Sequence, residues 1–193
     1  MIDITRITPR QKLIIETGLL EYRYVMKYWQ LNDADFQDVY HDLYLRARGG
    51  VMRKEGNKKP YFDKLQNISP ADSLIDIIED LKESMEQHCY EFSLSSKLLH
   101  TRNPLSPIYD SKVREYLSRE ENVHFWWNRS GAPRGTTEIE KIRHDWQLLN
   151  DWYDTMLDSD RGKKWIEWFD SMFPEDSEIS NVKKIDWIIF AVS

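Results

Sequence analysis

Two neighbouring segments concentrate reactive side chains more than any other part of the sequence. Residues 95–100 are Ser-Ser-Lys-Leu-Leu-His, and residues 107–113 are Pro-Ile-Tyr-Asp-Ser-Lys-Val. Together they place lysine, histidine, serine and aspartate within twenty residues. A lysine amine can form a Schiff base with a carbonyl carbon, and a carboxylate can stabilise positive charge that develops during a reaction. These two segments therefore hold the first candidates for chemistry.

Asp110 has two interpretations that do not exclude each other. The residues that follow it, with Val113 and Leu117 at helical spacing, predict a helix for which Asp110 is the N-cap. Its carboxylate would then accept main-chain N–H bonds. A carboxylate at a helix start is also held rigidly and kept ionised by the helix dipole, as a catalytic group requires.

Lys97 and His100 are three residues apart on a predicted helix over residues 92–101, so they share one face of it. The ordinary interpretation is a solvated lysine and a hydrogen-bonded histidine, since neither type is often buried without a partner. The functional interpretation is an amine and an imidazole placed side by side.

The elements that would position these residues are helices. Apolar spacings of three and four predict eight of them, near residues 13–28, 36–44, 74–85, 92–101, 111–117, 139–157, 165–172 and 179–189. Ser69 and Pro70 predict the N-cap and first turn of the third, and Thr137 with Glu140 predicts a capping box. Non-helical breaks between helices are expected at residues 49–50, 53–59 and 128–135. The sequence thus predicts one all-α domain of roughly eight helices over residues 1–193.

Composition narrows the class of protein. Of the 193 residues, only Cys89 is a cysteine, so an internal disulfide and a multi-thiolate zinc site are both excluded. The five histidines show no metal-binding spacing, and the chain has no Walker loop or dinucleotide turn. We therefore expect no cofactor and assign no metal-ligating residue. A metal site built from dispersed aspartates and glutamates stays open, because carboxylate ligands leave little spacing signature. Residues 1–6 lack a signal-peptide core, and no apolar run approaches a membrane span. These features predict a soluble cytoplasmic protein without a membrane partner, and they leave its oligomeric state open.

The charge is unevenly distributed. The net charge of −6 argues against a nucleic-acid partner, yet residues 46–64 carry +5 and residues 93–119 carry +3. Two such basic islands can bind a polyanion locally, or they can be ordinary solvated surface.

The segment from Ser95 to Leu117 resembles a motif of the helix-hairpin-helix DNA glycosylase superfamily. In that motif a proline and an apolar residue precede an aspartate, and a small hydroxylated residue then leads into a helix with Val, Arg and Leu. The segment is similar to 8-oxoguanine glycosylase-like uncharacterised bacterial proteins. The resemblance implies a glycosylase-like all-α fold and DNA as the partner.

The resemblance also implies roles for individual residues. Asp110 would stabilise the positively charged sugar as the base leaves, and Lys97 would be the amine that forms a Schiff base with the sugar. A flipped base must be held outside the stack. The residues implied for the second shell or the base pocket are Ser96, His100, Tyr109, Trp126 and Trp127. The superfamily's glycine-rich hairpin has no counterpart before Lys97, so the phosphate contacts are expected from Arg53, Lys54, Lys58, Lys59, Lys112 and Arg114.

Three functions stay open at this point. The first is a DNA glycosylase, with or without lyase activity. The second is a non-catalytic nucleic-acid binder with the same fold, and the third is a helical protein-interaction domain. The acidic net charge and the missing hairpin favour the third, whereas the motif around Asp110 favours the first.

Overall fold

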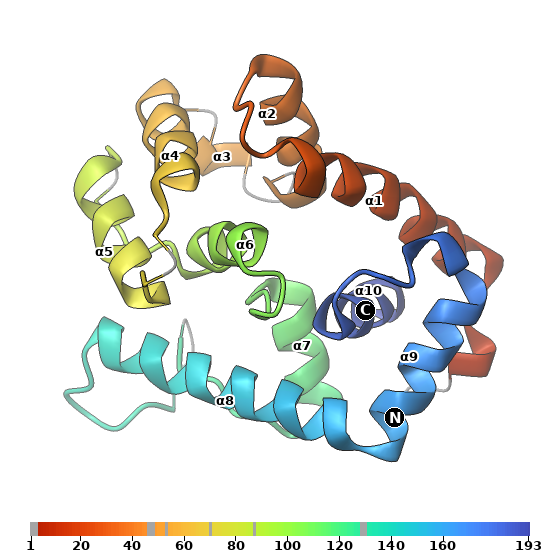
Figure 1. Ribbon diagram of the computed structural model, residues 1–193. Helices are drawn as coiled ribbons and strands as arrows, with labels where there is room; N and C mark the ends of the chain where they lie inside the picture. The colour runs from red at the N-terminus through yellow and green to blue at the C-terminus, as the bar shows by residue number, and fades with distance from the viewer. Residues whose placement is uncertain (1–3, 46–48, 53, 70, 87, 128–130) are drawn as a thin grey trace. The chain divides into compact units, whose positions relative to one another are not determined.

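The computed structural model describes residues 4–45, 49–52, 54–69, 71–86, 88–127 and 131–193 (Figure 1). Over these residues the chain is helical and contains no strand, which confirms the predicted all-α class. The chain divides into two compact units, which we call unit 1 (residues 1–16 and 104–193) and unit 2 (residues 17–103). That residues 1–193 form one domain stays a prediction.

Unit 2 contains most of α1 and five further α-helices. Its elements are α1 (Pro9–Tyr28, which begins in unit 1), α2 (Ala34–Tyr40), the π-helical segment η2 (His41–Leu45), α3 (Gly49–Met52), α4 (Glu55–Asn67), α5 (Leu74–Ser84) and α6 (Phe92–Arg102). Helix α5 packs against both α4 and α6. Buried aromatic rings fill the space between helices here, and Tyr40, Tyr61 and Phe62 pack edge to face.

Three sequence predictions for unit 2 are wrong. The predicted break at residues 49–50 lies within helix α3. The predicted break over residues 53–59 is mostly helical, because α4 already begins at Glu55. The predicted cap of α5 at Ser69 is replaced by Ser73, whose hydroxyl accepts the Asp76 N–H at 3.3 Å while Asp76 Oδ2 accepts the Ser73 N–H at 2.7 Å. This reciprocal capping box satisfies two N–H groups, so it outweighs the preference of proline for a first turn. Pro70 lies outside the described residues.

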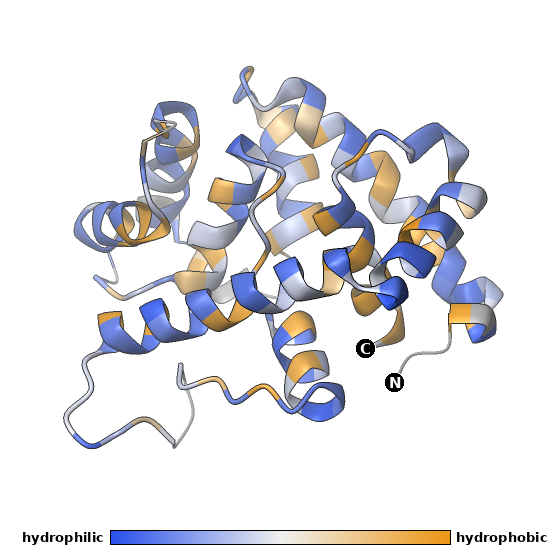
Figure 2. Ribbon diagram, turned by 60° about the horizontal axis from the view of Figure 1, so that its bottom comes forward, coloured by the Kyte–Doolittle hydropathy of each residue, from blue (hydrophilic) through white to orange (hydrophobic). Residues whose placement is uncertain are grey.

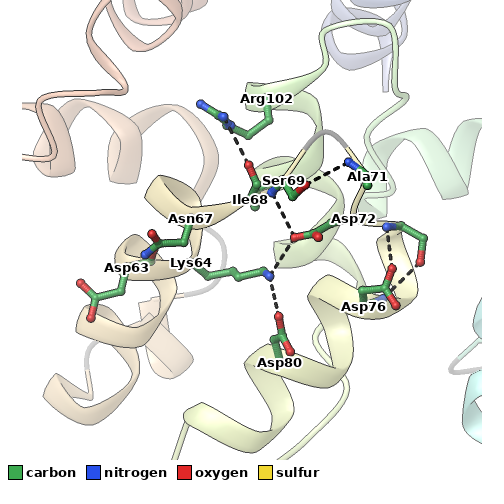
Figure 3. Close-up of polar contacts among 11 residues, drawn as sticks. Asp63, Lys64, Asn67, Ile68, Ser69, Ala71, Asp72, Asp76, Asp80 and Arg102 are labelled. Carbon is green, nitrogen blue, oxygen red and sulfur yellow. Dashed lines mark hydrogen bonds and ion pairs between the residues drawn. The ribbon is translucent and has the colours of Figure 1, made fainter.

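Ion pairs fix the connection between α4 and α5 (Figure 3). Lys64 Nζ lies 3.1 Å from Asp72 Oδ2 and 2.5 Å from Asp80 Oδ2. The hydrogen bond from Lys64 holds the pKa of Asp72 below its ordinary value. Arg102 on α6 donates to the Ile68 carbonyl at 3.3 Å. The charge of Lys64, part of the first basic island, is therefore already matched by two carboxylates.

Unit 1 is built around its last helix. Its elements are η1 (Ile4–Arg6), the start of α1, α7 (Ser111–Glu120), α8 (Glu138–Asp158), α9 (Asp160–Met172), η4 (Pro174–Asp176) and α10 (Asn181–Val192). Helix α10 packs against α7, α8 and α9. The predicted capping box of α8 is confirmed, since Glu140 Oε2 accepts the Thr137 N–H at 2.7 Å and Thr137 Oγ1 accepts the Glu140 N–H at 3.3 Å.

Helix α10 is buried on nearly every side. Its apolar residues include Ile185 and Ile188, which are fully buried, but its charged residues are buried as well. Lys183 pairs with Asp186, and Lys184 lies 2.7 Å from Asp170 Oδ1 on α9. Buried charges must be paired, and these lysines are.

Figure 2 shows hydrophilic and hydrophobic residues interleaved along the individual helices. This is the pattern of helices that bury one face and expose the other to water. Within the described parts of the chain, no helix combines the length and the apolar character needed to cross a membrane.

Candidate functional site

Asp110 is the N-cap of α7, as the sequence predicts. Its Oδ1 accepts the Val113 N–H at 2.9 Å, and its side chain is half-buried. Within the described residues, Asp110 forms no ion pair with a lysine, arginine or histidine. The structure therefore holds this carboxylate at a helix N-terminus, where the helix dipole favours its negative charge.

Unit 1 also buries polar groups on α8 and α10, and the charge of Asp110 acts on one of them, Tyr153. Tyr153 is 1% exposed. Burial, together with the charges of Asp186 and Asp110, raises the pKa of the Tyr153 hydroxyl well above its ordinary value, so this hydroxyl stays protonated at neutral pH. Lys183 Nζ donates to Asp186 Oδ2 at 2.6 Å.

A second cluster surrounds the fully buried carboxylate of Asp145 on α8. Its oxygens accept the main-chain N–H groups of Trp126 and Trp127 at 2.7 and 2.8 Å. They also accept the Tyr109 hydroxyl at 3.2 Å and lie 3.1 Å from Nδ1 of His144. One carboxylate therefore fixes the segment before α7, the segment after α7 and the imidazole of its own neighbour.

The aromatic rings of this cluster are ordered by Asp145. The rings of Trp126 and His144 are parallel, with centroids 3.4 Å apart, and Phe125 meets Tyr109 edge to face at 5.6 Å. Burial and the nearby Asp145 charge raise the pKa of Tyr109, so its hydroxyl remains a donor, and Arg114 lies beside it. The cluster presents a half-buried indole and an imidazole whose orientation is fixed through Nδ1.

The two clusters are separate along α8. Asp145 and Tyr153 are eight residues apart, which corresponds to about 12 Å of helix. The dipeptide Tyr109–Asp110 connects them, because the Tyr109 side chain reaches Asp145 whereas Asp110 lies near Tyr153. The structure therefore brings Tyr109, Trp126 and Trp127 together, but around Asp145 rather than around Asp110.

The other residues predicted near the chemistry lie on α6, in unit 2, whereas Asp110 belongs to unit 1. Ser96, Lys97 and His100 are all buried. Lys97 Nζ donates to Ser93 Oγ at 3.2 Å, and Ser96 Oγ donates to the Ser93 carbonyl at 3.0 Å. His100 Nε2 is 3.2 Å from the Tyr22 hydroxyl. As predicted, Lys97 and His100 share one helix; Lys97 is hydrogen-bonded within α6, whereas His100 contacts Tyr22 on α1.

The predicted phosphate-binding residues do not form one surface loop. Lys58 and Lys59 lie on helix α4, which corrects the expectation of a loop there, and Lys59 is paired with Asp63. Lys54 is exposed, Lys112 lies 5.8 Å from the Phe190 ring, and Arg114 lies beside the buried Tyr109. Arg53 lies outside the described residues.

Sequence reasoning missed Asp145, Tyr153, Lys183 and Asp186 as site residues. Asp145 had a usable signal, because it lies three residues after Ile142 and four before Leu149, inside the apolar stripe of α8. A carboxylate at such a position must be hydrogen-bonded in the core. Lys183 and Asp186 had a weaker signal, a three-residue spacing that ordinary surface pairs share.

Among the side chains that the structure places, His, Cys, Asp and Glu form no group of three or more suited to a metal ion. Comparison of the chain with protein-family models, curated proteins and solved structures finds no match.

Proposed function

We propose that this chain is a DNA-acting protein of the glycosylase type, in which Asp110 assists cleavage of the bond between a base and its sugar. The observation that carries the proposal is the environment of Asp110. It is a half-buried carboxylate fixed at a helix N-terminus, and no cation among the described residues pairs with it. When an N-glycosidic bond breaks, positive charge develops on the sugar, and a preorganised carboxylate stabilises it.

The proposed cleavage of the N-glycosidic bond requires few groups besides Asp110. As the C1′–N bond breaks, its electron pair leaves with the base, and the Asp110 carboxylate faces the positively charged sugar. Water then adds to C1′ and passes a proton to Asp110, which passes it on to the departed base, so that the carboxylate is regenerated. Lys97 stays the predicted amine for a lyase step, although it is buried and lies in the other unit. The aromatic cluster at Asp145 supports contacts with unstacked bases, since every base can stack on an aromatic ring.

The test uses short duplexes that each carry one modified base, including 8-oxoguanine, and measures base release as alkali-sensitive strand cleavage. Asp110→Asn should lower the single-turnover rate at least ~100-fold, the scale expected for loss of one electrostatic group. Because asparagine caps helices as well as aspartate does, this variant should stay folded. Asp154→Asn, an exposed change on α8, is the matched control. Equal cleavage by Asp110→Asn and the wild type would falsify the assignment.

Binding supplies an independent test. Fluorescence anisotropy with a duplex that carries an abasic-site analogue should show affinity that falls steeply with salt. Replacing Lys54, Lys58 and Lys59 by glutamine should weaken it. Absence of binding at low salt rules out both the glycosylase and the non-catalytic binder.

A helical protein-interaction domain is the second candidate. The observation in its favour is that basic residues of the first island already pair with carboxylates, Lys59 with Asp63 and Lys64 with Asp72 and Asp80. Lysines held in this way are less available to phosphates. This function predicts no salt-dependent affinity for DNA in the anisotropy experiment.

A further inference from the structure

The imidazole of His144 is held by a carboxylate whose acceptor positions are all in use. Asp145 Oδ1 accepts the Trp126 N–H and lies 3.1 Å from His144 Nδ1, while Oδ2 accepts the Trp127 N–H and the Tyr109 hydroxyl. These contacts match the roughly four lone-pair positions of an ionised carboxylate, which can only accept hydrogen bonds. His144 Nδ1 must therefore donate, so the neutral ring carries its proton on Nδ1.

This proton position leaves a lone pair on Nε2 of His144. The hydrogen bond that one ring nitrogen makes decides the tautomer of a histidine, and the other nitrogen is then an acceptor. Among the described residues, Nε2 of His144 has no hydrogen-bond partner and does not belong to the buried unpartnered atoms. The side chain is 28% exposed. Nε2 is therefore an acceptor that a ligand can reach.

The acceptor is also held in a fixed plane. The His144 ring lies parallel to the indole of Trp126, with 3.4 Å between the centroids, and the same carboxylate binds the Trp126 main chain. A donor must approach the lone pair of an imidazole nitrogen in the plane of the ring. The ligand that fits is thus one that carries an N–H group at its edge and can lie beside a half-buried aromatic ring, as an unstacked base does.

We propose that His144 is a specificity-determining residue of unit 1, whose Nε2 accepts a hydrogen bond from a ring N–H of an unstacked nucleobase. That the ligand is a nucleobase rests on the proposed function. The acceptor itself does not, because it follows from the contacts of Asp145.

The first measurement determines the tautomer of His144. Long-range ¹H–¹⁵N correlation spectra distinguish protonated from unprotonated ring nitrogens in protein labelled at histidine. Spectra recorded at about pH 8, where an ordinary imidazole is neutral, should show the proton of His144 on Nδ1. The variant His144→Asn identifies the signals of this ring by their loss. A proton on Nε2 would overturn the proposal.

The second measurement tests the hydrogen bond to the base. The probe is a fluorescein-labelled single strand of roughly twelve thymidines, a length typical of single-strand binding sites. It is compared with the same strand methylated at N3 of every base, because N3–H is the one N–H donor of thymine and methylation keeps the ring for stacking. Fluorescence anisotropy at low salt and about pH 8 should show roughly fivefold tighter binding of the unmodified strand, the factor for one net hydrogen bond. Equal affinities would overturn the proposal.

Variants assign this difference to His144. His144→Asn lacks the Nε2 acceptor, although its amide can still donate to Asp145, so it should bind both strands equally. His124→Asn is the matched control, since His124 is an exposed histidine two residues before Trp126, and it should keep the fivefold difference. If His144→Asn does not fold, His144→Phe, which keeps a ring on Trp126, replaces it. A fivefold difference that persists without the imidazole would overturn the proposal.

These outcomes can be told apart from those of the proposed function. A difference between the strands that depends on His144, combined with no base release from any duplex, would support the role of His144 and overturn the cleavage reaction alone. Base release that needs Asp110, combined with equal binding of the two strands, would support the reaction and overturn the role of His144. No binding of either strand at low salt would also overturn the role of His144, whatever the duplexes show.

Discussion

Trp126 and His144 stack with their ring planes 2° apart, and Asp145 binds both residues, one through its main-chain N–H and the other through Nδ1. The stack is thus fixed by a buried carboxylate and not by ring contact alone. It joins the segment after α7 to α8, and the Tyr109 hydroxyl adds the segment that leads to Asp110. Three parts of unit 1 therefore depend on one side chain.

Replacing Asp145 should therefore lower the stability of the protein. In Asp145→Asn the side chain keeps its shape, but an amide NH₂ group then faces N–H and O–H donors. Leaving buried donors unsatisfied costs about 1–3 kcal/mol for each group, so we expect the free energy of unfolding to fall by about 3 kcal/mol or more. Urea denaturation measures this loss. Asp154→Asn should change stability by less than about 0.5 kcal/mol. A similar small change for Asp145→Asn would show that the carboxylate is dispensable.

The junction of α8 and α9 depends on the absence of a side chain at position 162. Gly162 is buried, and its N–H donates to Ser159 Oγ at 3.0 Å. A Cβ at this position would collide with the main-chain carbonyl oxygen of Met156, which cannot move without displacing the end of α8. Gly162→Ala should therefore lower stability by about 3 kcal/mol, the upper part of the range for overpacking. Thermal unfolding compared with exposed Lys163→Ala tests this, and equal melting temperatures would contradict it.

High pH should destabilise the aromatic core of unit 2. Burial raises the pKa of Tyr40 to about 12, against an ordinary value of about 10. Between these two values the unfolded chain has lost the proton that the folded chain keeps. The contribution of Tyr40 is therefore full below about pH 10 and is lost as the pH rises to about 12, a change of about 2–3 kcal/mol.

Tyr40→Phe isolates this contribution. Its stability should decline less steeply than that of the wild type between pH 10 and 12, when urea midpoints are compared across the range. The variant also loses the hydroxyl contact with Tyr61 at 3.2 Å, which lowers its stability at every pH. Parallel pH profiles for the two proteins would show that Tyr40 does not titrate as expected.

The sequence predicts a helix start correctly wherever the local residues allow only one capping arrangement. Thr137 and Glu140 can satisfy each other's N–H groups, and Asp110 can accept from Val113, so both helix starts were predicted and found. The sequence predicts the wrong N-cap for α5. It indicates Ser69, but Ser73, four residues later, has an aspartate at capping-box spacing and is the cap. Either serine could cap the helix on local grounds, and the choice between them depends on where the helix begins in the folded chain.

The candidate site was predicted less well than the fold, because its geometry is tertiary. The resemblance implies Tyr109, Trp126 and Trp127 as base-pocket residues for Asp110, but the carboxylate that gathers them comes from α8. Lys183 and Asp186 have the spacing of a surface pair, and only the packing of α10 places them inside. Hydrophobic periodicity in the sequence predicts which face of a helix is buried. It does not predict that a helix such as α10 is buried on nearly every side, because that depends on the helices packed around it.

The central position of α10 also has a consequence for biosynthesis. Unit 2 is one continuous stretch, residues 17–103, whereas the core of unit 1 is closed by α10 at residues 181–192. A ribosome adds roughly 5–20 residues per second, so the roughly 90 residues between these points take about 5–20 s to make. During that interval α7, α8 and α9 emerge without the helix they pack against. Nascent unit 1 is therefore the part of this chain most exposed to chaperones and proteases.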